Sequence, residues 1–196
     1  MMKTVKPIIL ASRSPRRVQL LRQIGLSFTS QESGVDERIA EGTAPEDAVR
    51  QLSLEKARHV ASRLHNGIVI GADTIVVLDG AILGKPLSKE DAVSMLSRLG
   101  GKTHTVFTGF ALLDVESKRS YIDYEKTEVT FRQLGKEEIE GYVQSGSPMD
   151  KAGAYGIQDD YGAVFVERIN GCFYTVVGFP LSKFYTALNR FLEQLT

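Results

Sequence analysis

The hydrophobic pattern of this chain alternates between short apolar runs and longer amphipathic segments. The run at 7–11 predicts a buried strand, and Leu20, Leu21 and Ile24 follow with the spacing of one helix face. Further apolar runs predict extended segments over 28–33, 68–72, 75–78 and 81–83. The first half of the chain is therefore expected to alternate strands with helices.

Local signals predict where these helices begin and end. Ser14-Pro15 supplies an N-cap and a proline at the first helical position. Thr43–Glu46 indicates a capping box with Thr43 as the N-cap, opening a helix that runs to about residue 64. Ser88–Asp91 predicts the start of another helix, which stops at 100–101. Asp79-Gly80 lies between two extended segments and indicates a hairpin turn.

Longer extended segments dominate the second half. The expected elements are an antiparallel pair of strands over 105–115 and 120–134, a helix over 136–145, a hairpin of 161–169 with 173–177 that turns at Asn170-Gly171, and an amphipathic helix from Pro180. We therefore predict an α/β fold with a mixed, partly antiparallel sheet flanked by helices. Polar motifs in both halves favour one domain over 1–196 with two lobes and a cleft.

Composition narrows the function classes. The 196 residues include 24 basic and 24 acidic side chains, and this balance argues against general nucleic-acid binding. Cys172 is the single cysteine, which excludes an internal disulfide and a cysteine-based zinc site. No apolar run resembles a signal peptide or approaches the length needed to span a bilayer. A cytoplasmic protein without a membrane or nucleic-acid partner is expected.

The segment Ser12–Arg17 predicts an anion site. Arg16 and Arg17 fall in the first helical turn, where each cation opposes the helix dipole by about 0.3–1 kcal/mol. A phosphate bound at this helix start would resolve the conflict, because backbone N–H groups and guanidinium groups both favour an anion. The alternatives are solvated arginines, a phosphorylation site or a DNA-binding arm.

Other polar residues lie at the ends of predicted elements. Asp73 follows an apolar strand, where it could act as a general base or a Mg²⁺ ligand, or cap the next segment. Lys85 lies in a rigid Gly-Lys-Pro turn suited to a phosphate, although such lysines are often solvated. Lys56 lies on or beside an apolar helix face, where it could also extend to solvent. Asp150–Gln158 combines small residues with a charge and an amide that can contact a base. Together these groups favour metal-assisted phosphoryl transfer.

The motifs resemble those of the Maf family of nucleotide pyrophosphatases. In order along the chain they are Ser12-x-Ser14-Pro15-Arg16-Arg17, Asp36-Glu37, Glu55-Lys56-Ala57, Gly71-Ala72-Asp73-Thr74, Gly84-Lys85-Pro86, Thr103-His104-x-Val106-x-Thr108-Gly109 and Asp150–Gln158. The resemblance implies a fold related to inosine triphosphatases, with the active site in a cleft between two lobes. It also implies hydrolysis of a nucleoside triphosphate to the monophosphate and pyrophosphate with Mg²⁺ or Mn²⁺.

The resemblance further implies roles for single residues. Asp73 matches the family's catalytic acceptor, and with Glu37 it would hold the metal. The other polar positions of the implied substrate site are Ser12, Arg16, Arg17, Glu37, Lys56, Thr74, Lys85 and Gln158. Among these, Arg16, Thr74 and Gln158 match positions that tune base preference, and they carry the residues of the dTTP/UTP subgroup. One departure is Asp159-Asp160, which follows where many relatives have glycine.

The resulting hypothesis is a dTTP/UTP pyrophosphatase, with modified pyrimidine nucleotides as alternative substrates. A second hypothesis from another class is a nucleotide-binding regulator of cell division and septum formation that acts through a protein partner. Homodimers are common in the family that the motifs resemble, so the resemblance allows a homodimer here, while the sequence itself does not reveal the oligomeric state.

Overall fold

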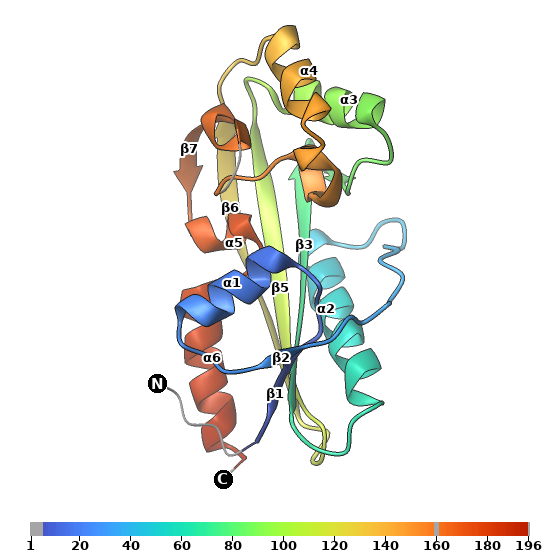
Figure 1. Ribbon diagram of the computed structural model, residues 1–196, viewed down its shortest axis with the longest axis vertical. Helices are drawn as coiled ribbons and strands as arrows, with labels where there is room; N and C mark the ends of the chain where they lie inside the picture. The colour runs from blue at the N-terminus through green and yellow to red at the C-terminus, as the bar shows by residue number, and fades with distance from the viewer. Residues whose placement is uncertain (1–5, 159–160, 196) are drawn as a thin grey trace. The chain divides into compact units, whose positions relative to one another are not determined.

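A seven-stranded mixed sheet organises the described part of the chain, residues 6–158 and 161–195 of the computed structural model (Figure 1). The strands are β1 (Ile8–Leu10), β2 (Thr29–Ser30), β3 (Ile68–Leu78), β4 (Ala81–Leu83), β5 (Thr103–Asp114), β6 (Ser120–Phe131) and β7 (Val166–Asn170). The α-helices are α1 (Pro15–Gln23), α2 (Pro45–Ala61), α3 (Lys89–Leu99), α4 (Lys136–Gln144), α5 (Phe173–Val177) and α6 (Leu181–Glu193). Three 3₁₀ turns are η1 (Ser147–Asp150), η2 (Ala152–Ala154) and η3 (Tyr161–Phe165).

The sheet combines parallel and antiparallel pairs. Its strand order is β2-β1-β3-β5-β6-β7, with β4 paired to β3 outside this path. β1 is parallel to both β2 and β3, whereas β4 is antiparallel to β3 and β7 is antiparallel to β6. β5 continues into β6 through a tight hairpin in which the Asp114 N–H donates to the Arg119 carbonyl at 2.9 Å. The predicted mixed, partly antiparallel α/β fold is therefore confirmed.

The chain divides into two compact units. Unit 1 comprises Met1–Asp73, Thr108–Glu125 and Gly178–Thr196, and unit 2 comprises Thr74–Phe107 and Lys126–Val177. Three of the four divisions fall inside β3, β5 and β6, so each of these strands contributes residues to both units; the fourth follows α5.

Each unit has a core of its own. In unit 1, Ala57, Val60 and Ala61 of α2 pack on apolar residues of β1, β3 and β5. In unit 2, buried residues of α3 and α4 pack with aromatic residues that include Phe131 and Phe165. In the described ranges, no helix combines the length and apolar character needed to cross a membrane.

Two predicted helix starts are confirmed and one is wrong. The Ser14 Oγ accepts from the Arg17 N–H at 3.5 Å, and the Ser88 Oγ accepts from the Asp91 N–H at 3.2 Å, so both serines are N-caps. Thr43 is not an N-cap, because α2 begins one residue later than predicted, with Ala44 as its cap. The reason is that Pro45 fits the first helical position, where its fixed φ suits the helix and no N–H is needed.

The predicted hairpin of 161–169 with 173–177 is wrong. Its first half contains η3 and then β7, and β7 pairs with β6 in the register Glu128↔Asn170. Its second half is the helix α5. The Thr127 Oγ1 accepts from the Cys172 N–H at 2.9 Å and donates to the Cys172 carbonyl at 3.0 Å, so the chain turns away from the sheet at this point. β6 is a strand partner distant in sequence, and no local pattern could reveal it.

Candidate active site

Two glycines in neighbouring strands let helix α2 lie unusually close to the sheet. A Cβ atom on Gly71 of β3 would lie 1.9 Å from the Ser53 carbonyl oxygen of α2. A Cβ atom on Gly109 of β5 would lie 2.4 Å from the Val49 carbonyl oxygen. Since no side chain fits at either distance, only glycine permits this approach. The helix is therefore held against the strands one turn before Lys56.

Lys56 is the centre of a buried charge cluster in unit 1. Its Nζ donates to Asp73 Oδ1 at 2.5 Å and to Glu37 Oε1 at 2.6 Å. Lys56 is 4% exposed and Asp73 is 5% exposed, whereas the Glu37 side chain is 43% exposed. Extension of the Lys56 side chain to solvent, one of the two alternatives that the sequence allowed, is therefore wrong. Its ammonium fixes one oxygen of each carboxylate.

The position of Asp73 differs from the prediction. The segments 68–72 and 75–78 form one continuous strand, so Asp73 lies in the middle of β3 rather than at a strand end. Because side chains alternate along a strand, Asp73 lies on the same face as Gly71, which faces α2. A mid-strand backbone and a close helix together hold the carboxylate more rigidly than a loop would.

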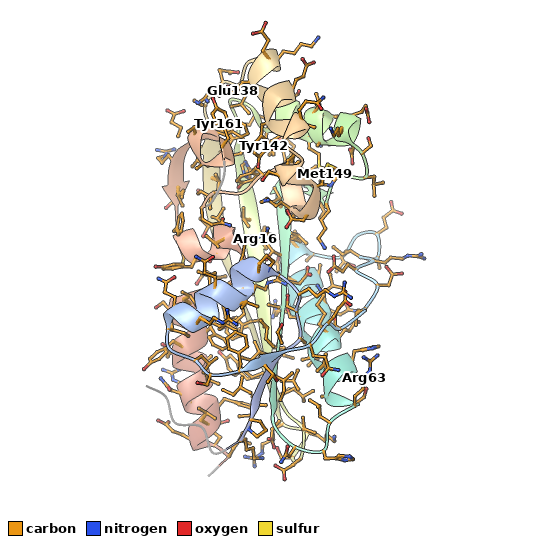
Figure 2. The ribbon with its side chains drawn as sticks, viewed as in Figure 1. Arg16, Arg63, Glu138, Tyr142, Met149 and Tyr161 are labelled. Atoms are coloured by element: carbon orange, nitrogen blue, oxygen red, sulfur yellow. The ribbon has the colours of Figure 1, made fainter. Side chains whose placement is uncertain are left out.

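The start of α1 forms a second polar cluster in unit 1. The Ser14 N–H donates to Ser12 Oγ at 3.1 Å, and Arg17 Nη1 donates to the same oxygen at 3.4 Å. Arg17 Nε also donates to the Gly178 carbonyl at 3.0 Å. Arg17 is thus tied at two points, while Arg16 lies beside it in the first helical turn (Figure 2).

Electrostatics place the two clusters of unit 1 in one neighbourhood. Burial lowers the pKa of Arg17, and the charge of Arg16 lowers it further. The charges of Asp73 and Glu37 act in the opposite direction on the pKa of Arg17. Arg17 therefore lies close enough to both carboxylates for their negative charges to act on its guanidinium group. The structure thus brings together Ser12, Arg16, Arg17, Glu37, Lys56 and Asp73.

The other three predicted site residues, Thr74, Lys85 and Gln158, belong to unit 2. The Gly153 N–H donates to the Gly84 carbonyl at 3.0 Å, which joins the turn carrying Lys85 to the segment that leads to Gln158. Gly153 has a φ of +69°, and a Cβ atom there would lie 3.0 Å from the Val76 side chain. Val76 shares a strand face with Thr74. Asp159-Asp160, the departure from the family pattern, lies outside the described residues.

A buried histidine–tyrosine pair in unit 2 was not predicted from the sequence. His104 Nε2 and the Tyr155 hydroxyl lie 2.7 Å apart, and both rings contact Phe131 edge-on. Burial raises the pKa of Tyr155 and lowers the pKa of His104 to about 4, so neither group is charged near neutral pH. The pair anchors the segment that ends at Gln158. Both residues lie in the family motifs, but their spacing in sequence gives no sign of the contact.

His104 makes stability depend on pH. Its pKa is about 4 in the folded state against an ordinary value of 6.5, so the unfolded chain takes up the proton first as the pH falls. The free energy of unfolding is expected to drop by about 2 kcal/mol between pH 7 and pH 5 from this residue. Urea unfolding at a series of pH values measures the drop. In His104→Gln the slope over this range should largely vanish; an unchanged slope would contradict the assignment.

Comparison with known proteins identifies relatives over nearly the whole chain. A family model described as Maf-like protein matches residues 7–191. A dTTP/UTP pyrophosphatase of Desulforamulus reducens is 48% identical, covering 95% of this chain and 97% of the relative. Another dTTP/UTP pyrophosphatase, from Pelotomaculum thermopropionicum, is 46% identical, covering 95% of this chain and 97% of the relative.

A solved structure shares the fold at low sequence identity. A HAM1 protein from Coxiella burnetii aligns with a TM-score of 0.51 and 17% identity, covering 95% of this chain and all of that structure. At this identity the likeness concerns the fold alone. The family model and the sequence relatives confirm the family that the motifs predicted, and the solved structure agrees with the predicted fold class.

Proposed function

The chain belongs to the Maf-like protein family, and from that premise we propose that it hydrolyses dTTP and UTP to the nucleoside monophosphate and pyrophosphate. The names of its relatives support this substrate class. The observation that carries the proposal is the buried Asp73 carboxylate, fixed by Lys56 and within electrostatic reach of Arg17. A held carboxylate beside cations is what attack of water on a phosphate anhydride requires.

The start of α1 is the proposed phosphate site. The positive end of the helix dipole favours an anion there, and Arg16 and Arg17 add positive charge at the same place. Ser12, bonded to Arg17 Nη1, keeps that guanidinium oriented. From the family resemblance, Lys85 is a further proposed phosphate ligand, and Arg16, Thr74 and Gln158 are the proposed base-selective residues.

Asp73 is the proposed acceptor of the proton from the attacking water. Lys56 holds Oδ1, which leaves Oδ2 for the water. As the water oxygen bonds to the α-phosphorus, its proton passes to Asp73, and the bond from the α-phosphorus to the bridging oxygen breaks. The electron pair of that bond leaves with pyrophosphate, whose charge the neighbouring arginines stabilise.

The carboxylates also fit a divalent metal. Glu37 Oε1 and Asp73 Oδ1 both contact Lys56 Nζ, at 2.6 and 2.5 Å, so the two carboxylate oxygens lie close to each other. In the described ranges no cluster of three or more His, Cys, Asp or Glu side chains is arranged around a metal site. Two carboxylates plus substrate phosphates is the ligand set that Mg²⁺ commonly uses. We propose that Glu37 and Asp73 hold Mg²⁺ or Mn²⁺, which would polarise the phosphate oxygens.

A panel of triphosphates tests the proposed reaction. With Mg²⁺ or Mn²⁺, kcat/KM for dTTP and UTP is expected to exceed that for purine triphosphates by about 10-fold or more, because a base-binding site distinguishes rings of different size and polarity. The measurement is pyrophosphate release in a buffer at neutral pH, because we propose that the enzyme works in the cytoplasm. Including 5-methyl-UTP and pseudo-UTP decides whether modified pyrimidine nucleotides are preferred. No pyrophosphate from any triphosphate would contradict the proposal.

A further inference from the structure

Lys56 occupies the space that the proposed metal would need. Its ammonium bonds one oxygen of Glu37 and one oxygen of Asp73, at 2.6 and 2.5 Å. These are the two carboxylates to which we assign the metal, so a resident cation already bridges them. With Lys56 4% exposed, the ammonium has little access to water if it leaves these partners.

A divalent ion that entered the free protein would meet two obstacles. It would have to compete with a positive charge held within hydrogen-bond distance of both ligands, and like charges at such distances repel strongly away from bulk water. Among the described residues it would also find only two carboxylates, and one oxygen of each is already bonded to Lys56, whereas divalent ions prefer about six oxygen ligands. Neighbouring Arg17 adds a further positive charge, since it senses both Glu37 and Asp73.

The triphosphate removes both obstacles. It brings several oxygen ligands and negative charge that offsets Lys56 and Arg17. Building on the proposed function, we propose that Lys56 holds the metal's place in the free protein, so that the divalent metal binds only together with the nucleotide. After the pyrophosphate has left, the Lys56 ammonium again neutralises Glu37 and Asp73.

Direct Mn²⁺ binding tests this order. Electron paramagnetic resonance measures bound Mn²⁺ in the full chain, alone and with the non-hydrolysable analogue α,β-imido-dUTP, after the Mn²⁺ held by the analogue itself is subtracted. The free protein is expected to bind Mn²⁺ at least about 10-fold more weakly than the nucleotide complex. Equal affinity with and without the analogue would overturn the inference, and this arm needs no variant.

Removing the ammonium gives the second arm. Lys56→Met keeps an unbranched side chain, one atom shorter, but removes its charge, so the free protein is expected to bind Mn²⁺ about 10-fold more tightly. A circular dichroism melt checks that the variant folds, and Lys56→Gln serves if it does not. Unchanged Mn²⁺ affinity in a folded variant would overturn the inference.

Lys183 supplies a matched control. Its Nζ also lies between two carboxylates, at 3.3 Å from Asp123 Oδ1 and 3.8 Å from Glu125 Oε2, but its side chain is 38% exposed. Lys183→Met is expected to leave the Mn²⁺ affinity of the free protein unchanged. If Lys183→Met raised the Mn²⁺ affinity as much as Lys56→Met, removing a lysine from any pair of carboxylates would suffice, and the inference would be overturned. Failure of the proposed function is seen separately, as absence of pyrophosphate release from every triphosphate.

Discussion

Asp73→Asn is expected to lower kcat for pyrophosphate release by about 10²- to 10⁴-fold, the usual contribution of a positioned general base. The amide keeps the shape of the side chain but accepts no proton from water. It also gives Lys56 Nζ a neutral partner in place of the carboxylate that it now contacts at 2.5 Å. Steady-state kinetics with dTTP, together with an unfolding curve, measure the loss and show that it does not reflect misfolding.

Asp79→Asn is the matched control for that experiment. Asp79 also pairs with a lysine, since Lys102 Nζ lies 2.9 Å from its Oδ2, but this pair is exposed and follows β3 at a hairpin turn. Asp79 has a φ of 52°, which asparagine tolerates well, so the turn should persist and kcat should stay within about two-fold of the original. Near-full activity in Asp73→Asn would refute the assigned role. If an Asp73 variant without activity still restored normal cell division, the regulatory alternative would gain support.

Gly71→Ala is expected to destabilise the fold by about 3 kcal/mol or more, at the upper end for overpacking. The added methyl carbon would lie 1.9 Å from the Ser53 carbonyl oxygen, which belongs to helix backbone and has no rotamer to change. Helix α2 must therefore move away from β3, and Lys56 moves with it. Urea unfolding measures the stability, and pyrophosphate release from the fraction that remains folded should also fall.

Gly141→Ala provides a control of opposite sign. Gly141 lies within α4, and a Cβ atom there meets nothing within 4 Å. Since alanine favours the helix, the variant is expected to gain about 0.5–1 kcal/mol of stability with unchanged activity. If Gly71→Ala had an effect as small as this variant, the close approach of α2 to the sheet would be refuted.

Elements encoded by neighbouring residues were predictable from the sequence. The serine caps at Ser14 and Ser88 and the hairpin at Asp79-Gly80 all appear in the structure, because each depends on contacts within about four residues. The α6 helix after Pro180 also agrees with its apolar periodicity. These features arise from hydrogen bonds and turn geometry that do not require the rest of the fold.

Features that depend on distant partners were not predictable. The short apolar run Phe173–Val177 suits a strand or a helix equally, and in the structure it forms α5 directly after the contacts of Thr127 with Cys172. From the sequence Lys56 could be buried or extend to solvent, and its contact with Asp73 of β3 shows that it is buried. Asp73 and Lys85 were predictable from their chemistry and Glu37 only from the family resemblance. The way Lys56 joins two carboxylates follows from packing that no local pattern encodes.

The hydrogen bond from Arg17 Nε to the Gly178 carbonyl also bears on how the protein is made. It joins residues 161 positions apart, and unit 1 draws on three separate stretches of chain, the last of which starts at Gly178. A ribosome that releases the chain from its N-terminus therefore exposes Arg17 long before its partner has been synthesised. Contacts of such high sequence separation form slowly. The start of α1 should thus become ordered late, after the ribosome has delivered the segment that holds it.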